Sequence, residues 1–582
     1  MNSNRPGYPF CLLLVFLVGS LLSCARLDHR APAAETGAVQ EQKRVIDEEE
    51  DRLLRAYAYF TIASLYETDG RYEEALAHFT KALENDPESV YLHRKMAILL
   101  KDLKDYPEAV THARKCIELD PENMDHRMLL AEIFAVSKNE ESAIEEYKRI
   151  LDLEPKEQRV RLVLVTLLIK TGQYDEARRH LDQLIREDSG LVIAHYYKGR
   201  INLERKDYEE AEKAYRRALQ LNERMEPALF ELGSLYQMNE RYEQAAEIYE
   251  KLLHYYPSNV IVRDRLIGVY YKLGREKTAE GHMEEIKRQT KPGDPGRQTL
   301  GLIYLRHGKI DESIEELELI VSAWPEDQKS RYYLAAAYEE KGETEKALEQ
   351  FKAVKEGSEY YSNARIHIAF ILEGQEKYDE AIDVLEKAIK TDEEKVALYL
   401  LLASILETKK EYEKAKGVIE EGLKGHSENI ELIFRLAVVL DKMGQKEKGL
   451  EQMRRILEIN PEHADALNYI GYTYAEQGIR LDEAMALIEK ALRIKPESGY
   501  IIDSLGWVYY QKGMYEEALK YLEKAASHVP NDPTVSEHLG DVYFKLKRYQ
   551  ASLEMYRKAI SQNHPEQEKI KGRIEEVEKF LK

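Results

Sequence analysis

A small side chain recurs along this chain every 34 residues, and this period restricts the fold to an array of short, similar units. Starting from Ala75, successive steps of 34 residues meet alanine, serine or glycine as far as Gly449. One residue is inserted near 479–481, and the series then resumes at Ala484, Ala518 and Ser552. Periods of 20–50 residues are typical of arrays in which each unit buries its apolar face only against its neighbours. The length of 582 residues is therefore explained by repetition and does not require several separate cores.

A second series of small residues lies about twelve residues before the first. Its members are alanine or glycine, except that Val165 and Ile267 are large. Two small positions at this spacing predict a pair of antiparallel helices whose axes approach closely where the small residues meet. Turn glycines such as Gly70 and Gly513 separate the two helices, and prolines such as Pro87 end many units. The pattern predicts an all-α superhelix of about fifteen helix-turn-helix repeats.

The period and the two small positions together resemble the tetratricopeptide repeat (TPR). The resemblance covers about 56–565, with repeats 1–7 in 53–292, repeats 8–15 in 293–566 and a polar capping helix in 567–582. It implies an α-solenoid that binds other proteins. The segment Thr290–Arg297 (TKPGDPGR) interrupts the helical composition with two prolines and two glycines. Either the solenoid bends there, or the first helix of the eighth repeat is shortened after a longer turn.

Residues 1–23 are predicted to be the signal peptide of a bacterial lipoprotein. The apolar run Phe10–Leu22 is short for a membrane span but suits a signal-peptide core. The tetrapeptide 21–24 (LLSC) resembles the lipobox, in which the cysteine, here Cys24, receives diacylglycerol and becomes the new N-terminus. By the same resemblance, Ala25 implies the outer membrane, with the protein facing the periplasm. The alternative is an ordinary signal peptide with an incidental cysteine.

The segment 24–52 is predicted to be the lipidated cysteine and a tether, because it is polar and without periodicity to about Gln42. Of the three cysteines, Cys11 would be removed and Cys24 modified, which leaves no intramolecular disulfide. Cys116 falls in a helical repeat, in a helix-packing position where other repeats have alanine. We therefore expect Cys116 to be a free, buried thiol.

Charge and motifs argue against several classes of function. A formal net charge of −21 would repel a phosphate backbone, so nucleic acid is not expected as a partner. No glycine-rich phosphate loop, His-Glu-x-x-His, EF-hand loop or Cys-x-x-Cys is present, and the 16 histidines are scattered. The repeats also leave no separate domain to hold a catalytic site. We therefore expect no enzyme, no cofactor, no metal and no small-molecule substrate.

Function is then expected on the inner face of the solenoid, where TPR proteins present positions 2, 5, 9 and 12 of each first helix. Some TPR domains hold C-terminal carboxylates with lysine and asparagine at these positions, but position 9 is never asparagine here. The predicted partner-binding groove lies in repeats 13 and 14 and consists of Asn468, Tyr472, Tyr500, Asp503, Trp507 and Tyr510, with Tyr469 beside them. The alternative for Trp507 is that it packs between neighbouring first helices and only stabilises the array.

The stretches 466–484 and 500–518 resemble a double repeat of proteobacterial TPR lipoproteins of the cell envelope. Some members of that group look like adaptors that bring substrates to a periplasmic carboxyl-terminal processing protease. The resemblance implies a non-catalytic, lipid-anchored scaffold or adaptor with protein or peptide partners. The alternative is a TPR lipoprotein component of a secretion, pilus or exopolysaccharide-export machine.

Overall fold

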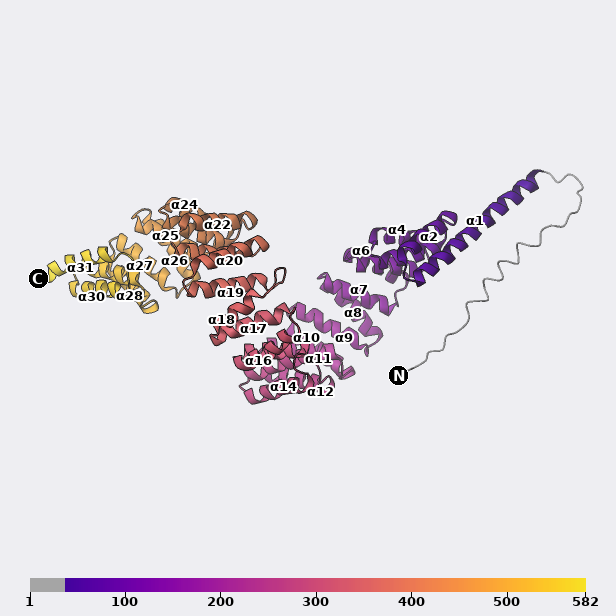
Figure 1. Cartoon of the computed structure of the whole chain (residues 1–582), viewed down its shortest axis with the longest axis horizontal. Helices are drawn as coiled ribbons and strands as arrows, with labels where there is room; N and C mark the ends of the chain where they lie inside the picture. The colour runs from indigo at the N-terminus through magenta and orange to yellow at the C-terminus, as the bar shows by residue number, and fades with distance from the viewer. Residues whose placement is uncertain (1–36) are drawn as a thin grey trace, which may run out of the picture. The chain divides into compact units, whose positions relative to one another are not determined.

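The computed structural model describes the backbone of residues 37–582 and the side chains from residue 48 on. All regular structure in this part of the chain is α-helical, with thirty-one helices joined mainly by short turns (Figure 1). The predicted signal peptide and Cys24 lie outside the described residues. None of the described helices has both the length and the apolar character needed to cross a membrane.

Residue contacts divide the chain into two compact units, with the division between Tyr255 and Tyr256. It falls one repeat before the predicted boundary at 292/293. The first unit contains α1 (Gly37–Thr68), α2 (Tyr72–Asn85), α3 (Val90–Asp102), α4 (Tyr106–Leu119), α5 (Met124–Val136), α6 (Glu140–Leu153), α7 (Gln158–Lys170), α8 (Tyr174–Glu187), α9 (Val192–Glu204), α10 (Tyr208–Leu221), α11 (Glu226–Met238) and α12 (Tyr242–Tyr255).

The second unit continues the same alternation of first and second helices and ends with one additional helix. It contains α13 (Val260–Lys272), α14 (Glu276–Gln289), α15 (Pro295–Arg306), α16 (Ile310–Ala323), α17 (Gln328–Lys341), α18 (Thr344–Lys352), α19 (Tyr361–Gly374), α20 (Tyr378–Thr391), α21 (Val396–Thr408), α22 (Tyr412–Gly425), α23 (Ile430–Lys442), α24 (Lys446–Ile459), α25 (Ala464–Glu476), α26 (Leu481–Ile494), α27 (Gly499–Gln511), α28 (Tyr515–His528), α29 (Pro533–Lys545), α30 (Tyr549–Ser561) and α31 (Gln567–Leu581).

The prediction of a tether over 24–52 is wrong from Gly37 onward, because α1 begins there and runs into the first repeat. In Figure 1, α1 projects beyond α2. The residues of this extension are mostly alanine, glutamine, glutamate, lysine and arginine, which favour helix strongly. An ion pair between Arg55 and Asp51, one turn apart, adds support. Because the helix is anchored where it packs in the first repeat, it can extend further towards its N-terminus even though the extension has no periodic apolar residues.

The two small-residue positions meet in the core of each repeat, as the sequence predicts. Gly199 on α9 lies under the ring of Tyr215 on α10, and a Cβ at Gly199 would lie 2.5 Å from the Cε1 of Tyr215. Glycine is required there because the ring occupies the space of any side chain. In the preceding repeat the same two positions hold Val165 and Leu181, both fully buried. A larger residue on the first helix is thus matched by a residue without a ring on the second.

Serine replaces alanine at two of the close helix contacts. The hydroxyl of Ser313 donates a 2.8 Å hydrogen bond to the carbonyl oxygen of Gly301, and that of Ser552 donates one of the same length to Gly540. Both serines are completely buried. Serine is tolerated at these contacts because the facing first helix accepts its hydrogen bond.

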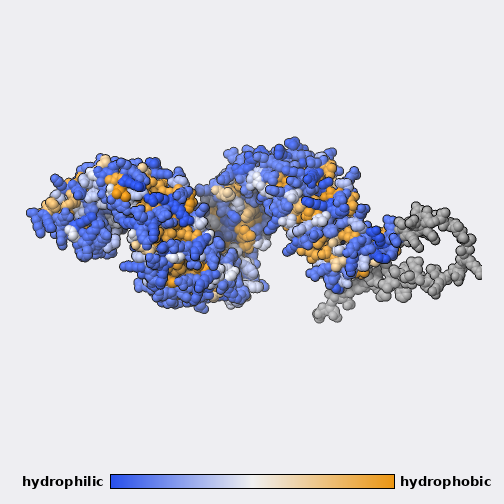
Figure 2. Space-filling view, turned by 90° about the horizontal axis from the view of Figure 1, so that it is seen from above, coloured by the Kyte–Doolittle hydropathy of each residue, from blue (hydrophilic) through white to orange (hydrophobic). Residues whose placement is uncertain are grey.

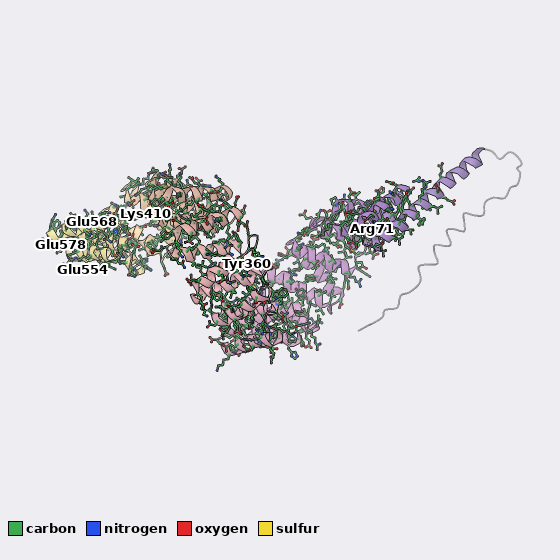
Figure 3. All side chains as sticks on the ribbon, viewed as in Figure 1. Arg71, Tyr360, Lys410, Glu554, Glu568 and Glu578 are labelled. Carbon is green, nitrogen blue, oxygen red and sulfur yellow. The ribbon has the colours of Figure 1, made fainter. Side chains whose placement is uncertain are left out.

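The turns inside the repeats use the left-handed backbone conformation. The prediction of left-handed glycine caps is confirmed, with φ between 67° and 81° at Gly70, Gly172, Gly274, Gly308, Gly342, Gly444 and Gly513. Other repeats place a larger residue there, such as Lys410 with φ 61° (labelled in Figure 3). The one-residue insertion is accommodated in the turn between α25 and α26, which has left-handed residues at both Gly478 and Arg480. The helices on either side keep their usual lengths.

The odd-numbered helices lie on the inner side of the array. Within the second unit, consecutive odd helices contact each other, as α25 does α27 and α27 does α29. Among the described helices, consecutive even helices make no contacts of comparable extent. Axes that converge on one side and diverge on the other produce a curved array, with the odd helices on the concave face.

In the segment Thr290–Arg297, residues 290–294 join α14 to α15, the last three residues are helical, and buried contacts hold the segment. The buried Arg297 forms an ion pair with the buried Glu316. The indole nitrogen of Trp324 donates a 2.8 Å hydrogen bond to the carbonyl oxygen of Gly293. Helix α15 has 12 residues, whereas α13 and α17 have 13 and 14. These features favour a shortened first helix after a longer turn, and bending at this segment stays a prediction.

Candidate functional site

The groove residues predicted on α25 and α27 meet at a histidine of α29 that the sequence analysis did not single out. The Nδ1 of His538 lies 3.0 Å from each carboxylate oxygen of Asp503. Its ring stacks on Trp507 with a centroid distance of 4.1 Å, and its centroid lies 6.3 Å from that of Tyr472. One imidazole therefore joins side chains from three successive first helices.

Asp503 and His538 are both buried, and burial determines how they affect each other. Burial opposes the positive charge of the imidazole, but the Asp503 carboxylate, helped by Asp541 and Glu537, outweighs it and raises the pKa of His538 above its usual value. The protonated ring then lies face to face with the indole of Trp507, an arrangement that favours a cation. Asp503 is thereby directed to α29, and its carboxylate is occupied inside the protein.

Trp507 is half-buried between two rings. The Tyr510 ring lies 4.6 Å from the indole at an interplanar angle of 11°, on the same helix, and His538 stacks from the next first helix. Burial, reinforced by the nearby Asp541, raises the pKa of Tyr510 to about 12. The indole Nε1 is buried and has no hydrogen-bond partner among the described residues. Trp507 thus packs against a neighbouring first helix while part of its surface remains on the inner face.

The other predicted residues are distributed differently. Tyr500 projects into solvent, with 61% of its side chain exposed. Asn468 is partly buried, and its Oδ1 has no partner among the described side chains. Tyr469 packs towards the preceding repeat, where a Cβ at Gly449 would lie 3.3 Å from the Tyr469 hydroxyl. The structure therefore brings together Tyr472, Asp503, Trp507 and Tyr510, and it places Tyr469 apart from them.

Position 6 of the first helix is the signal that would have identified His538. Side chains at this position pack on the preceding repeat, as Tyr469 does near Gly449. His367 occupies the same position on α19 and stacks on Phe351 of α18 at 4.8 Å. A titratable residue at position 6 beside a carboxylate at position 5 of the preceding helix predicts a buried ion pair. Positions 2, 5, 9 and 12, which point to the inner face, do not include this residue.

The inner positions of the last repeat are covered by the C-terminal helix. Glu537 and Asp541 occupy positions 5 and 9 of α29 and are both buried. Glu537 pairs with His564 at 2.8 Å and with Arg573 of α31 at 3.2 Å, and Arg573 also pairs with Asp541. Helix α31 therefore closes the array through specific ion pairs, and the open groove ends at α29.

The inner face of the first helices before α27 also carries apolar side chains. A cleft of about 440 Å³ lies there, with Leu400, Phe434 and Val438 among its apolar lining. These residues hold positions 5 and 9, so the positional rule that led to Trp507 also applies to them. We call the inner face of α21, α23, α25 and α27 the C-terminal groove, and its principal apolar and aromatic side chains are Leu400, Phe434, Val438, Tyr472 and Trp507.

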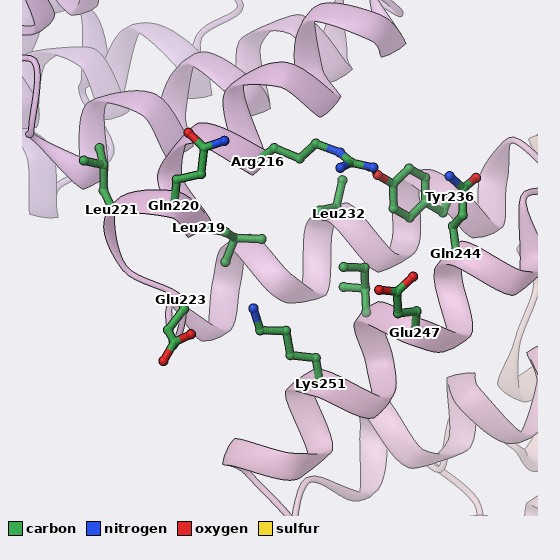
Figure 4. Close-up of a pocket in the computed structure, with 11 residues that line it drawn as sticks. Arg216, Leu219, Gln220, Leu221, Glu223, Leu232, Tyr236, Gln244, Glu247 and Lys251 are labelled. Carbon is green, nitrogen blue, oxygen red and sulfur yellow. The ribbon is translucent and has the colours of Figure 1, made fainter.

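A second cleft, of about 560 Å³, lies on the outer side between α10 and α12 (Figure 4). Its apolar floor is formed by Leu219, Leu232 and Ile248. The rim carries charges of both signs, namely Arg216, Lys251, Glu223 and Glu247. Because these charges are balanced, the cleft does not indicate one class of partner.

The surface is mainly hydrophilic, with hydrophobic residues gathered in separate patches (Figure 2). In the part of the chain that the structure describes, no group of three or more histidine, cysteine, aspartate or glutamate residues is arranged to hold a metal ion. The clefts of the described surface have apolar linings with charged residues beside them.

Family comparisons agree with the helix pairs. Tetratricopeptide repeat families match residues 56–89, 162–225, 202–258, 372–428, 434–499 and 504–568. The family of anaphase-promoting complex (cyclosome) subunit 3 matches 102–184 and 297–388. None of these is a catalytic family.

Individual relatives share the repeat over limited lengths. A TPR repeat-containing protein of Pseudomonas aeruginosa is 40% identical over 63 residues, which are 11% of this chain and 11% of that protein. A chain of an APC/C hetero-tetramer has 15% identity and a TM-score of 0.35, with 84% of this chain and 96% of that chain covered. A tetratricopeptide repeat protein of Parabacteroides merdae has 19% identity and a TM-score of 0.31, with 37% and 98% covered. Similarities this distant carry no argument about function.

The period, the helix pairs closed by small residues and the family matches agree with one another. TPR arrays are protein–protein interaction scaffolds, and no catalytic family is indicated. The chain therefore belongs to the tetratricopeptide-repeat proteins, as an α-solenoid of about fifteen repeats.

Proposed function

We propose that this protein is a lipid-anchored adaptor of the bacterial cell envelope that holds a protein partner in the C-terminal groove. The observation that supports this most directly is the row of partly exposed apolar and aromatic side chains on consecutive first helices. Phe434, Tyr472 and Trp507 lie on three of these helices and are each only partly buried. Aromatic side chains on a concave surface bury large areas with little loss of side-chain entropy, which suits a peptide or helix.

The chemistry of the groove indicates what the partner contributes. Its apolar positions call for aliphatic or aromatic side chains on one face of a helix or on an extended segment. Trp507 is held rigidly by the stacked His538 and Tyr510 rings. A preorganised ring loses little freedom on binding, so Trp507 is the expected centre of the binding energy.

The anchor is proposed from the lipobox-like residues 21–24 and the apolar run before them. Lipidation of Cys24 would place the repeats in the periplasm at the outer membrane. Sixteen residues of α1, from Gly37 to Arg52, precede the first repeat. As a helix they span about 24 Å, at 1.5 Å per residue. This extension would hold the repeats away from the lipid surface, where they could present a substrate to a periplasmic protease.

The groove is tested by photo-crosslinking followed by measurement of affinity. A benzoylphenylalanine at the exposed Tyr500 position captures the bound partner in cells, and the purified partner is then titrated against variants. We expect Trp507→Ala to weaken binding by about 2 kcal/mol or more. Tyr521→Ala is the matched control, because Tyr521 stacks on Tyr509 at 5.2 Å from the second helix α28. The affinity of the Tyr521→Ala variant for the partner should equal that of the wild type.

A different result would contradict the groove. If Trp507→Ala lowers the melting temperature but the folded fraction binds the partner normally, Trp507 only stabilises the array. The identity of the captured partner separates the adaptor from the alternative. A protease or its substrate supports the adaptor, whereas a secretion, pilus or polysaccharide-export component would replace it.

The anchor is tested separately by metabolic labelling with a palmitate analogue. The wild-type protein should carry the label and partition with the outer membrane, and Cys24→Ser should lose both properties. Cys116→Ser is the control and should keep the label, because Cys116 is buried in α4. A wild-type protein without lipid would refute the anchor and leave the groove untouched.

A further inference from the structure

The first two repeats contain another cleft on the inner side, between α1 and α3. Its volume is about 260 Å³. Sites that take whole small molecules have about 300–1,000 Å³, so this cleft suits a single long side chain. It belongs to the first unit and shares no residue with the C-terminal groove.

Aromatic rings form the walls of this cleft. The Phe60 and Tyr91 rings meet edge to face, with centroids 5.4 Å apart. Tyr57 and Tyr91 both hold position 2 of the first helix in the repeat pattern, and they are 62% and 55% exposed. The fold itself therefore leaves two large aromatic side chains on the inner face, where the core does not use them. Their faces are available to a ligand.

Two polar groups at the cleft also remain without partners. The carboxylate of Asp86 and the hydroxyl of Ser89 line the cleft. Neither forms a side-chain hydrogen bond or ion pair with any described residue, and Ser89 does not cap α3 with its side chain. The start of α3 carries about half a positive charge, which the full negative charge of Asp86 outweighs. The nearby guanidinium of Arg52 donates to the carbonyl oxygen of Asn85 at 3.4 Å and does not pair with Asp86, so the cleft presents a carboxylate beside aromatic rings.

We infer that this cleft binds the cationic side chain, arginine or lysine, of a protein partner. Aromatic faces attract cations, and the Asp86 carboxylate supplies the opposite charge. An acidic side chain would be repelled by Asp86. A purely apolar one would cover that carboxylate without giving it a partner, which is unfavourable. This inference rests on the proposed scaffold function and adds a charge requirement at the N-terminal end.

The cleft is tested by selecting displayed random dodecapeptides on the full chain, with removal of those that also bind Asp86→Asn. The surviving peptides should share an arginine or lysine beside an apolar residue. Synthetic copies with that basic residue changed to glutamine should bind the wild type at least tenfold more weakly. At the higher peptide concentrations needed to detect binding by Asp86→Asn, the same change should weaken binding by a smaller factor, since the charge pair is already lost there and only the aromatic rings still favour a cation.

Matched variants separate the cleft from general surface effects. Tyr57→Ala and Tyr91→Ala should each weaken the selected peptides several-fold, whereas Tyr72→Ala should not. Tyr72 is 47% exposed and does not line the cleft. Glu88→Gln is the corresponding charge control for Asp86→Asn. Unchanged melting curves for all five variants establish that folding is intact.

The inference is overturned if no peptides survive the selection, or if the survivors lack a basic residue. It is also overturned if Glu88→Gln weakens binding as much as Asp86→Asn does. A parallel selection with removal on Trp507→Ala keeps the two proposals apart. Peptides that depend on Trp507 but not on Asp86 would support the C-terminal groove, and they would reject the cationic site if the first selection yields none that depend on Asp86.

Discussion

The carboxylate of Asp503 receives a hydrogen bond from the Nδ1 of His538 at 3.0 Å, and this contact joins two successive first helices at the end of the groove. The two residues are 35 positions apart in sequence. Both are buried, so each depends on the other for compensation of its charge. The pair sets the position of the imidazole on which Trp507 stacks.

We expect Asp503→Asn to lower the pKa of His538. In the wild type, Asp503 raises this pKa above its usual value of about 6.5. In the variant, burial remains while this carboxylate is gone, so the pKa should fall, with Asp541 and Glu537 left as the carboxylates that still raise it. Histidine-selective NMR titration measures both values. Equal pKa values in the two proteins would show that the pair does not determine the charge of His538.

The same shift predicts a pH dependence of stability. Because the folded-state pKa is raised, the stabilisation is complete below the unfolded pKa of about 6.5 and is lost as pH rises through the folded value. Removal of one member of a buried pair costs about 3–5 kcal/mol, so Asp503→Asn should lower the stability of α27 and α29 most at pH 6. Hydrogen exchange of these helices at several pH values measures it. The exposed His528→Gln is the control and should follow the wild type.

The close contact of Gly199 with Tyr215 predicts a compensating pair. Gly199→Val alone should destabilise α9 and α10 by about 1–3 kcal/mol, because the ring leaves no space for a side chain. Gly199→Val with Tyr215→Leu recreates the Val165–Leu181 pair of the preceding repeat and should recover at least half of that loss. Hydrogen exchange measures each step. Additive effects of the two changes would contradict the packing argument.

A second glycine provides the matched control for that cycle. Gly417 lies inside α22, with no atom within 4 Å of a Cβ built there. Gly417→Ala should therefore stabilise its helix by about 0.5–1 kcal/mol, since alanine favours helix more than glycine does. Destabilisation by this change would mean that the second helices tolerate no added side chain even in open space.

Lys410 is predicted to be replaceable by glycine with a gain in stability. It adopts φ 61°, a conformation that costs about 1–2 kcal/mol for a residue with a Cβ. Lys410→Gly removes this cost, partly offset by the greater freedom of glycine in the unfolded chain, for a net gain of about 0.5–1 kcal/mol. Gly444→Ala, at φ 75°, is the converse change and should destabilise. Urea denaturation of both variants checks these opposite signs.

Cys116 should be unreactive in the native protein, and the structure confirms that it is free and buried, as the sequence predicts. Burial raises the pKa of its thiol to about 11, so little thiolate exists at pH 8. Iodoacetamide at pH 8 should modify the Cys116 peptide only in denaturant, as followed by mass spectrometry. Rapid native labelling would indicate that the second repeat opens.

Most of the fold could be predicted from the sequence, because repetition reveals it independently at many positions. The small series through Ala75 marks where helices meet, and the glycine caps mark where they turn. Local composition alone predicted the structure of individual segments less well than the repeat period did. The extension of α1 from Gly37 carries no apolar period, and helix propensity decides its structure. The segment Thr290–Arg297 has loop composition, yet buried contacts of Arg297 hold it.

The candidate groove was predicted only in part, because position within a repeat does not specify the partners of a side chain. Trp507 lies on the inner face as its position 9 implies. Asp503 follows the same rule but is turned towards His538, a contact between repeats that no single-repeat pattern contains. Phe434, which lines the apolar cleft, also lies at an inner-face position of its repeat. It was not predicted because no tryptophan marks that repeat.

The turn that holds Arg480 shows where this architecture tolerates a change of length. The inserted residue is taken up between α25 and α26, and the helix pair beside it keeps its glycine contact at Gly471. The number of residues can therefore change in the turn between two paired helices, whereas it is fixed within the helices themselves. A reporter peptide spliced after Gly478 would mark the array without shifting any repeat relative to the next.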